Sequence, residues 1–164
     1  MLTNYLKLSV ANNCARVDFT QLGAPARREE GMQQEDRKTG RFEDGSEDII
    51  AACIEVHRHL GPGLLESAYE RCLACELSLR GFAFERQRPV PVSYKGVVLD
   101  CGFRADLIVA DTFLIELKAV ERLTPVHLAQ ALTYLKLTGL PVALLVNFNA
   151  PTLKDGLRRL ARKI

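Results

Sequence analysis

The chain has 164 residues, of which 48% are hydrophobic and 26% are charged, a balance that suits one domain with a hydrophobic core. Its formal net charge of +2 neither requires nor excludes a nucleic-acid partner, because a local basic patch can exist on a nearly neutral protein. No apolar run approaches the roughly 20 residues that cross a bilayer, and the start of the chain lacks the regions of a secretory signal. We therefore expect no membrane span and no secretory signal.

The five cysteines are Cys14, Cys53, Cys72, Cys75 and Cys101. An odd number without a regular framework predicts free thiols in a reducing, cytoplasmic setting. Cys72-x-x-Cys75 has the spacing of metal ligands, but no second Cys or His pair stands at zinc-finger distance, and the pair falls inside an amphipathic helix pattern. We interpret it as packing rather than as a zinc or redox site.

Residues 1–46 are expected to form a disordered or irregular N-terminal extension. Residues 26–48 are dense in charge of both signs and poor in large apolar side chains, so burial there cannot offset the entropy of ordering. Met32 opens "MQQEDRKTG", which raises the hypothesis that the natural chain starts there. The folded domain is expected to span residues 47–164.

Two helices are predicted at the start of this domain. Ser46 is expected to be the N-cap of a helix over 47–60, with acidic residues in its first turn. Gly-Pro-Gly at 61–63 ends that helix, and a second helix is predicted over 64–80 with Gly81 as its C-terminal breaker.

A strand-rich stretch follows, with a hairpin expected to turn at Lys95-Gly96 and a second strand pair expected to turn near Asp111-Thr112. The predicted strands and hairpin cover 82–87, 90–103, 104–111, 112–120 and 141–148. Helices are predicted over 125–138 and 153–164, the second closing the chain. This order predicts an α/β fold, with a mixed central β-sheet flanked by helices on both sides.

The apolar segment "TFLIELKAV", residues 112–120, is interrupted by Glu116 and Lys118. Side chains alternate along a strand, so both lie on one face, roughly 6–7 Å apart. On the neighbouring strand "GFRADLIV", alternation puts Asp106 on one face and Ala105 on the other, and a hairpin would set Asp106 beside Glu116. Two close carboxylates repel unless a proton or a cation intervenes, and a hard divalent cation such as Mg²⁺ would satisfy both. The alternative is a plain ion pair of Lys118 with one carboxylate at a sheet edge.

Two helices add polar residues at helical spacing. In "GPGLLESAYE" Gly63, Glu66 and Tyr69 recur every three residues, so Glu66 and Tyr69 share a helix face. In "AQALTYL" Gln130 and Tyr134 are four apart and again share a face. Taken alone, Glu66 would complement a helix dipole and the other residues would belong to ordinary amphipathic helices.

Together, these motifs give the chain a resemblance to the GxxExxY protein family, named for the motif that runs here from Gly63 to Tyr69. The segments "RADLIV", "IELKAV", "AQALTYLK" and "VALLVNF" follow in that family's order, over residues 47–150. The family in turn is similar to the PD-(D/E)xK nuclease superfamily, which implies a restriction-endonuclease-like core. Ala105 stands where the superfamily's name has a proline; we expect it to face away from the site.

The resemblance implies a metal-dependent nuclease that hydrolyses phosphodiester bonds in DNA, with Mg²⁺ or Mn²⁺ as cofactor. Its implied metal ligands are Asp106, Glu116, Glu66 and the carbonyl of Leu117. Lys118 would position a water molecule or stabilise charge in the transition state. Catalytic residues implied by the resemblance are Glu66, Asp106, Glu116, Lys118, Gln130 and Tyr134.

Candidate nucleic-acid contacts are Arg104, on the Asp106 strand, and Lys95, on the hairpin. Arg104 could equally pair with Asp106 or Asp100. The alternative function is a catalytically inactive module on the same fold that binds nucleic acid or a protein partner, and a third reading is a structural ion-pair cluster without a ligand. DNA is the expected substrate and RNA the alternative, and a homodimer would suit the cutting of two strands.

Overall fold

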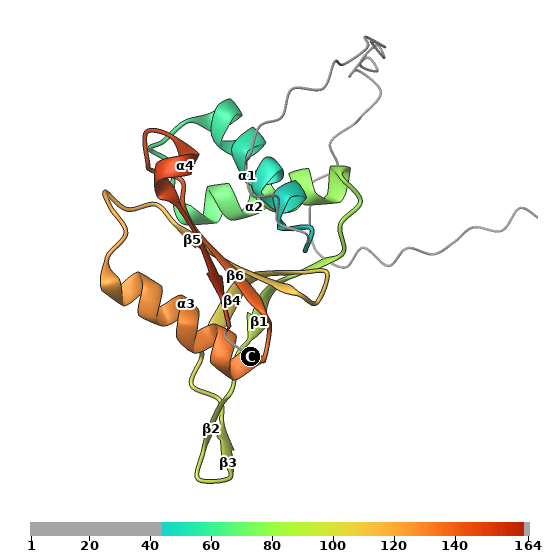
Figure 1. Ribbon diagram of the computed structural model, residues 1–164, viewed down its shortest axis with the longest axis vertical. Helices are drawn as coiled ribbons and strands as arrows, with labels where there is room; N and C mark the ends of the chain where they lie inside the picture. The colour runs from blue at the N-terminus through green and yellow to red at the C-terminus, as the bar shows by residue number, and fades with distance from the viewer. Residues whose placement is uncertain (1–43, 163–164) are drawn as a thin grey trace, which may run out of the picture. The chain divides into compact units, whose positions relative to one another are not determined.

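The computed structural model describes residues 44–162, which lie within one compact unit, Gly40–Ile164 (Figure 1). The extension expected over residues 1–46 falls outside the described residues as far as residue 43, and Ser46 already begins the first helix. Within residues 44–162, no helix is both long enough and apolar enough to cross a membrane.

Helices α1 (Ser46–Leu60) and α2 (Glu66–Leu79) lie where the sequence predicts them. The expected N-cap is wrong by one residue, because Gly45 takes that position with a φ of 81°. Ser46 is buried instead, and both its backbone N–H and its hydroxyl donate to Asp44 Oδ1, at 3.1 and 2.7 Å. A carboxylate two residues earlier thus supplies the acceptor that was expected from the serine.

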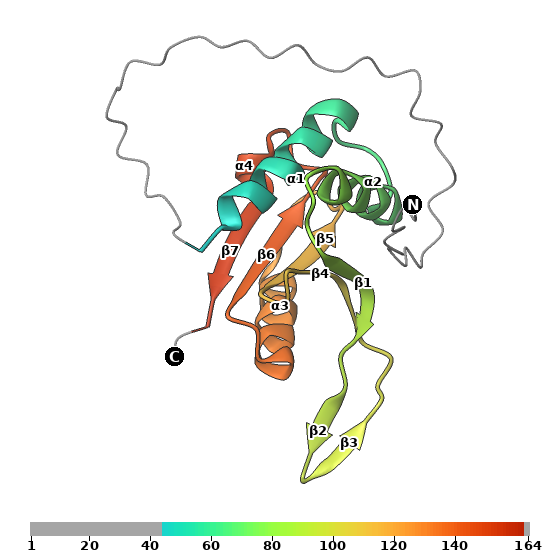
Figure 2. The same ribbon diagram turned by 90° about the vertical axis from the view of Figure 1, so that its right-hand side faces the viewer.

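The central sheet is mixed, which confirms the predicted α/β class (Figures 1 and 2). Strands β5 and β6 are parallel and all other neighbours are antiparallel. In spatial order its strands are β1 (Phe84–Pro89), β4 (Arg104–Val109), β5 (Phe113–Lys118), β6 (Val142–Asn147) and β7 (Leu157–Ala161).

The sheet carries a hydrophobic core on each face. One cluster joins α1 and α2 to the sheet and includes Leu107, Ile115 and Leu117. The other contains Leu114 together with Tyr134 of α3 (Pro125–Thr138). All residues of β6 are buried, as expected for a strand covered on both sides.

The C-terminal helix expected over 153–164 is wrong. Only a short helix, α4 (Leu153–Gly156), forms there, and the chain then continues as β7 along the outer edge of β6. Without β7 that edge would present unpaired backbone groups, so strand pairing overrides the helical spacing of the leucines. Gly156 allows the close return, since a Cβ there would collide with the carbonyl oxygen of Asn147.

A two-stranded hairpin, β2 (Val92–Tyr94) and β3 (Val97–Leu99), projects from the sheet (Figures 1 and 2). Lys95 and Gly96 both have positive φ, 48° and 83°, as a type I′ turn requires, so the predicted turn is confirmed. The β4–β5 turn lies one residue earlier than expected, with positive φ at Ala110 and Asp111.

Candidate active site

The regular backbone pairing between β4 and β5 ends next to Asp106. Regular pairing runs from Val109–Phe113 to Leu107–Ile115. One residue further, the backbone N–H of Leu117 donates to Asp106 Oδ2 at 2.9 Å, so a carboxylate fills the place of a backbone acceptor. Asp106 therefore lies at the point where the two strands diverge.

Glu116 is almost completely enclosed, with 2% of its surface exposed. Its Oε2 lies 3.9 Å from Lys118 Nζ, and its buried Oε1 has no hydrogen-bond partner in the described part of the chain. Burial, and after it the charge of nearby Asp106, raise the pKa of Glu116 to about 8, although the charge of Lys118 and the backbone of Asp106 oppose the shift. At neutral pH this carboxyl therefore holds a proton unless a cation replaces it.

The pKa of Asp106 is raised as well. Burial is the main cause, opposed by the N–H of Leu117 and by the charge of Lys118. One ammonium group thus faces two carboxyls at the same end of the sheet. When both acids are ionised, the two carboxylates carry one more charge than this ammonium neutralises. Such an excess of negative charge is expected of a site that binds a cation.

The motif residues of the α1–α2 connection shape the loop beside these acids. Tyr69 is fully buried, and its hydroxyl donates to the Gly61 carbonyl at 2.6 Å and accepts from the Leu64 N–H at 3.1 Å. Its ring stacks on Phe148, with centroids 4.6 Å apart. Gly63 has a φ of 107°, a conformation that favours glycine. Through these two hydrogen bonds, Tyr69 fixes the loop between α1 and α2 against the first turn of α2.

That loop delivers Glu66 to the end of β5. Glu66 Oε1 accepts a hydrogen bond from the backbone N–H of Ala119 at 3.1 Å, one residue beyond Lys118. Its negative charge also contributes to the raised pKa of Glu116. The structure therefore places Glu66 at the same end of β5 as Glu116 and Lys118.

Gln130 and Tyr134 are joined mainly to each other on α3. Gln130 Nε2 donates to the Tyr134 hydroxyl at 3.4 Å, and the tyrosine ring lies 6.1 Å from that of Phe103. Alternation along β5 puts Glu116 on the α3 side, because Leu114 packs there while Ile115 and Leu117 pack under α1 and α2. Within residues 44–162, no hydrogen bond or ion pair joins Gln130 or Tyr134 to the carboxylates.

The two candidate nucleic-acid contacts have different surroundings. Arg104 Nη1 donates to the backbone carbonyl of Gln87 at 2.9 Å, so neither of the pairings expected for it, with Asp106 or Asp100, is formed. Lys95 sits at the hairpin turn with its ammonium 5.4 Å from the centre of the Tyr94 ring.

The expected orientation of Ala105 is wrong. Ala105 packs in the same cluster as Ile108 on the α3 side, whereas Leu107 belongs to the opposite cluster. Strict alternation is interrupted between Ala105 and Leu107, opposite Gln87. Gln87 itself has a φ of 52°, outside the range of a regular strand.

Three functional candidates were not predicted from the sequence. Gln87 donates through Nε2 to both Glu70 Oε2 and Asp106 Oδ1, at 2.9 and 3.2 Å. Buried Asn147 accepts from the Val120 N–H and donates to the Val120 carbonyl, which fixes the chain just after Lys118. Glu70 stands four residues after Glu66, so helix spacing could have identified it.

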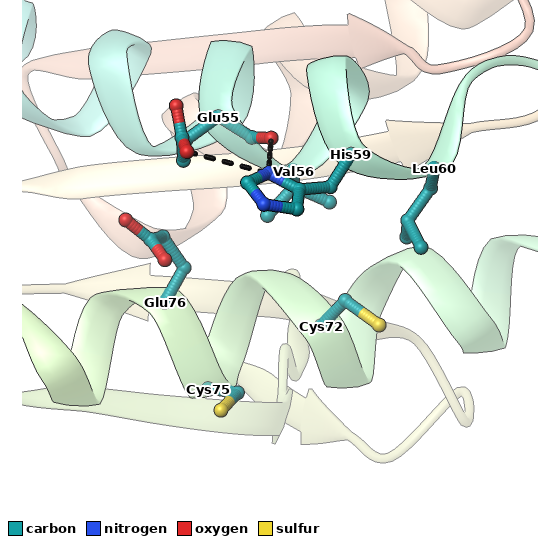
Figure 3. A pocket seen from close by; sticks show the side chains of 7 residues that line it. All are labelled: Glu55, Val56, His59, Leu60, Cys72, Cys75 and Glu76. Carbon is teal, nitrogen blue, oxygen red and sulfur yellow. Dashed lines mark hydrogen bonds and ion pairs between the residues drawn. The ribbon is translucent and has the colours of Figure 1, made fainter. Parts of the chain in front are cut away.

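The two thiols of Cys72-x-x-Cys75 line a hollow of about 230 Å³ between α1 and α2, together with Glu55 and Glu76 (Figure 3). His59 lies across from them and is paired with Glu55 of its own helix. Cys72 is half-buried and packs against the hydrophobic cluster of α1 and α2. In the described part of the chain, no three His, Cys, Asp or Glu side chains are grouped so as to hold a metal ion.

The same finding limits how a cation could bind at the diverging strands, because Glu66, Asp106 and Glu116 do not converge as three ready ligands. The donor set nevertheless fits a hard divalent cation. Two carboxyls with raised pKa lie close together, and one buried oxygen, Glu116 Oε1, has no hydrogen-bond partner. Backbone oxygens and water would have to complete the coordination.

Residues 43–160 match the family model of the PD-(D/E)XK nuclease superfamily. The chain belongs to this superfamily. No curated protein and no solved structure matches the sequence. Membership agrees with the five-stranded mixed sheet flanked by helices, and it indicates nuclease activity in general. Nucleases of this superfamily generally use divalent metals such as Mg²⁺ or Mn²⁺.

Proposed function

We propose that this superfamily member is a metal-dependent nuclease that hydrolyses phosphodiester bonds in DNA, and that it belongs to the GxxExxY family within the superfamily. The nuclease domain in this proposal spans residues 47–164. One observation supports the metal site above all others. Glu116 Oε1 is buried beside a second carboxylate and has no hydrogen-bond partner, an arrangement that is costly without a proton or a cation.

Asp106, Glu116 and the carbonyl of Leu117 would hold the cation, with Glu66 as a further oxygen donor. In a strand the N–H and C=O of one residue point to the same side. The Leu117 N–H points toward Asp106, so its carbonyl faces that side too. The neighbouring carbonyl of Lys118 faces the other way and accepts from the Phe148 N–H at 2.8 Å. Bound Mg²⁺ or Mn²⁺ would polarise the scissile phosphate and acidify a water molecule.

Lys118 would supply a positive charge near the reacting phosphate. Its side chain is 13% exposed, and its ammonium lies beyond hydrogen-bond distance of Glu116, so the ammonium can still donate to a substrate oxygen or a water. Gln130 and Tyr134, coupled through their own hydrogen bond, would orient Lys118 or contact the nucleic-acid backbone.

Arg104 and Lys95 would contact phosphates on either side of the reacting one. Among residues 44–162, no carboxylate pairs with the Arg104 guanidinium or the Lys95 ammonium: Arg104 donates to a backbone carbonyl and Lys95 lies over an aromatic ring. Charge available in this way is what a phosphate contact requires.

A cleavage assay tests the proposal. Purified protein is incubated with linear duplex, circular and single-stranded DNA, in Mg²⁺, in Mn²⁺ or in EDTA. We expect cutting in either metal, none in EDTA, and a loss of at least ~100-fold in Lys118→Met. The matched control is Lys136→Met, an exposed lysine of α3. Cutting that persists in EDTA, or that survives in Lys118→Met, would refute the mechanism. Metal binding without cutting of any form would favour a binding module.

A further inference from the structure

A chain of hydrogen bonds leads from α2 to Asp106 through Gln87. Arg86 Nε donates to Glu70 Oε1 at 2.9 Å, and Gln87 Nε2 donates to Glu70 Oε2 at 2.9 Å and to Asp106 Oδ1 at 3.2 Å. Glu70 is buried, with 8% of its surface exposed. A single side-chain amide thus joins a buried helix carboxylate to the acid at the diverging strands.

The Gln87 backbone departs from the strand to make this connection. The β1–β4 register pairs Arg86 with Leu107 and Arg88 with Ala105, but Gln87 and Asp106 between them are not paired. Gln87 has a φ of 52°, a conformation that costs of order 1 kcal/mol or more for a residue other than glycine. Its carbonyl accepts a hydrogen bond at 2.9 Å from Nη1 of Arg104, a side chain of the neighbouring strand β4. Such a departure persists only where other contacts impose it.

An amide suits this place better than a charged donor. A lysine or arginine at position 87 would neutralise Asp106 and compete with a cation, whereas a neutral amide donates without cancelling the charge. Its two N–H groups match the two carboxylates that it meets. With Oδ2 held by the Leu117 N–H, Asp106 is fixed through both oxygens and still keeps lone pairs for a ligand.

We propose that Gln87 is a positioning residue for the metal centre: it fixes the orientation of the Asp106 carboxylate, and Glu70, paired with Arg86, fixes Gln87. This inference rests on the proposed function, in which Asp106 is a metal ligand. Residues that hydrogen-bond to a metal ligand and fix its orientation typically contribute about 10–100-fold to metal affinity. Gln87 itself would contact neither the metal nor the substrate.

The decisive variant is Gln87→Asn. Asparagine keeps the amide and tolerates positive φ, so the backbone is not strained further, but its amide falls one methylene short of Asp106 and Glu70. A companion pair is Glu70→Gln and its control Glu76→Gln. Both glutamates lie on α2 and pair with an arginine Nε, but Glu76 pairs with Arg80, away from Gln87.

Two measurements on the full chain separate this inference from the proposed function. The first is Mn²⁺ affinity by calorimetry without nucleic acid, which should fall about tenfold in Gln87→Asn, less in Glu70→Gln and not at all in Glu76→Gln. The second is the Leu117 amide in metal-free protein, observed by NMR through its chemical shift and hydrogen exchange. It should change in Gln87→Asn and Glu70→Gln but not in Glu76→Gln, because only the first two release Asp106.

An unchanged Leu117 amide in folded Gln87→Asn would overturn the positioning role, whatever the metal does. Wild-type protein that binds no Mn²⁺ would instead overturn the proposed metal centre, and the Leu117 amide would still decide whether Gln87 holds Asp106. A changed amide with unchanged Mn²⁺ affinity would also refute the inference, because the positioning would then have no consequence for the metal.

Discussion

Glu116 and Lys118 share one face of β5, yet Glu116 Oε2 and Lys118 Nζ stay 3.9 Å apart, too far for a hydrogen bond. The lysine therefore lowers the electrostatic cost of the buried carboxyl without satisfying it. A plain ion pair would be expected to close to contact distance. This distance, together with the absence of a hydrogen-bond partner for Glu116 Oε1 among the described residues, agrees better with a site that binds an additional cation.

The metal-free protein should lose stability as pH rises. The pKa of Glu116 is about 8 in the folded chain against an ordinary value of 4.5, so from pH 4.5 to 8 the folded state holds a proton that the unfolded state has released. The contribution of Glu116 to the free energy of unfolding is therefore largest at the acidic end of this window and is lost as pH rises to about 8. Urea unfolding in EDTA across this range should show a fall of a few kcal/mol in wild type.

That fall should be much smaller in Glu116→Gln, whose amide does not titrate. Glu85→Gln, on an exposed side chain, is the control and should retain the wild-type slope. Equal pH dependence in Glu116→Gln and wild type would show that Glu116 is not the titrating group.

Metal binding should release a proton at neutral pH. A cation at Glu116 requires the ionised carboxylate, but with a pKa of about 8 the group is mostly protonated at pH 7. The Mn²⁺ affinity measured by calorimetry should therefore rise by up to about tenfold per pH unit below pH 8 and level off above it. A flat profile would mean that the metal, if bound, does not use Glu116.

Tyr69 should matter for stability in a way that an exposed tyrosine does not. Tyr69→Phe keeps the stacking on Phe148 but removes the bonds to Gly61 and Leu64. We expect a loss of roughly 1–3 kcal/mol in the free energy of unfolding, because two backbone groups lose their partner. Tyr94→Phe, at a residue that is 61% exposed, should leave stability unchanged. Equal stability of the two variants would contradict the role given to the motif tyrosine.

Glu66 can be tested for its two roles separately. Glu66→Gln keeps an oxygen that can accept from the Ala119 N–H but removes the charge, whereas Glu66→Ala removes both. If Glu66 serves the metal, Glu66→Gln should retain stability and lose Mn²⁺ affinity, and Glu66→Ala should lose both. Wild-type affinity in Glu66→Gln would restrict this residue to holding the end of β5.

Local patterns were enough to predict most strands and the acids at their ends. The alternation in "TFLIELKAV" identifies Glu116 and Lys118, and the Lys95-Gly96 dipeptide identifies its turn because few residues adopt positive φ. The GxxExxY motif was recognisable as a pattern. The contacts that its residues make could not be predicted from the sequence. The Tyr69 hydroxyl hydrogen-bonds the α1–α2 loop, and Glu66 accepts from the Ala119 N–H just after β5, a segment distant in the chain.

The remaining features depend on pairings that the sequence does not display. The residues of β7 have leucines at helical spacing, and only the open edge of β6 makes them a strand. Gln87 lies in a segment whose sequence is typical of a strand, and its positive φ accompanies hydrogen bonds to carboxylates on α2 and β4. Ala105 faces the side of the sheet opposite to the expected one because regular strand pairing is interrupted at Gln87 and Asp106. Counting alternate residues along the strand could not have predicted this orientation.

Calorimetric titration of Mn²⁺ into metal-free protein near pH 8 tests the central claim most directly, comparing wild type, Asp106→Asn and the control Asp111→Asn. Asp106→Asn keeps an oxygen for the Leu117 N–H, whereas Asp111 has a side chain that is 86% exposed and lies in the β4–β5 turn. We predict saturable binding in wild type and Asp111→Asn and its loss in Asp106→Asn. Absence of binding in wild type, or equal binding in all three proteins, would contradict a metal centre at the diverging strands.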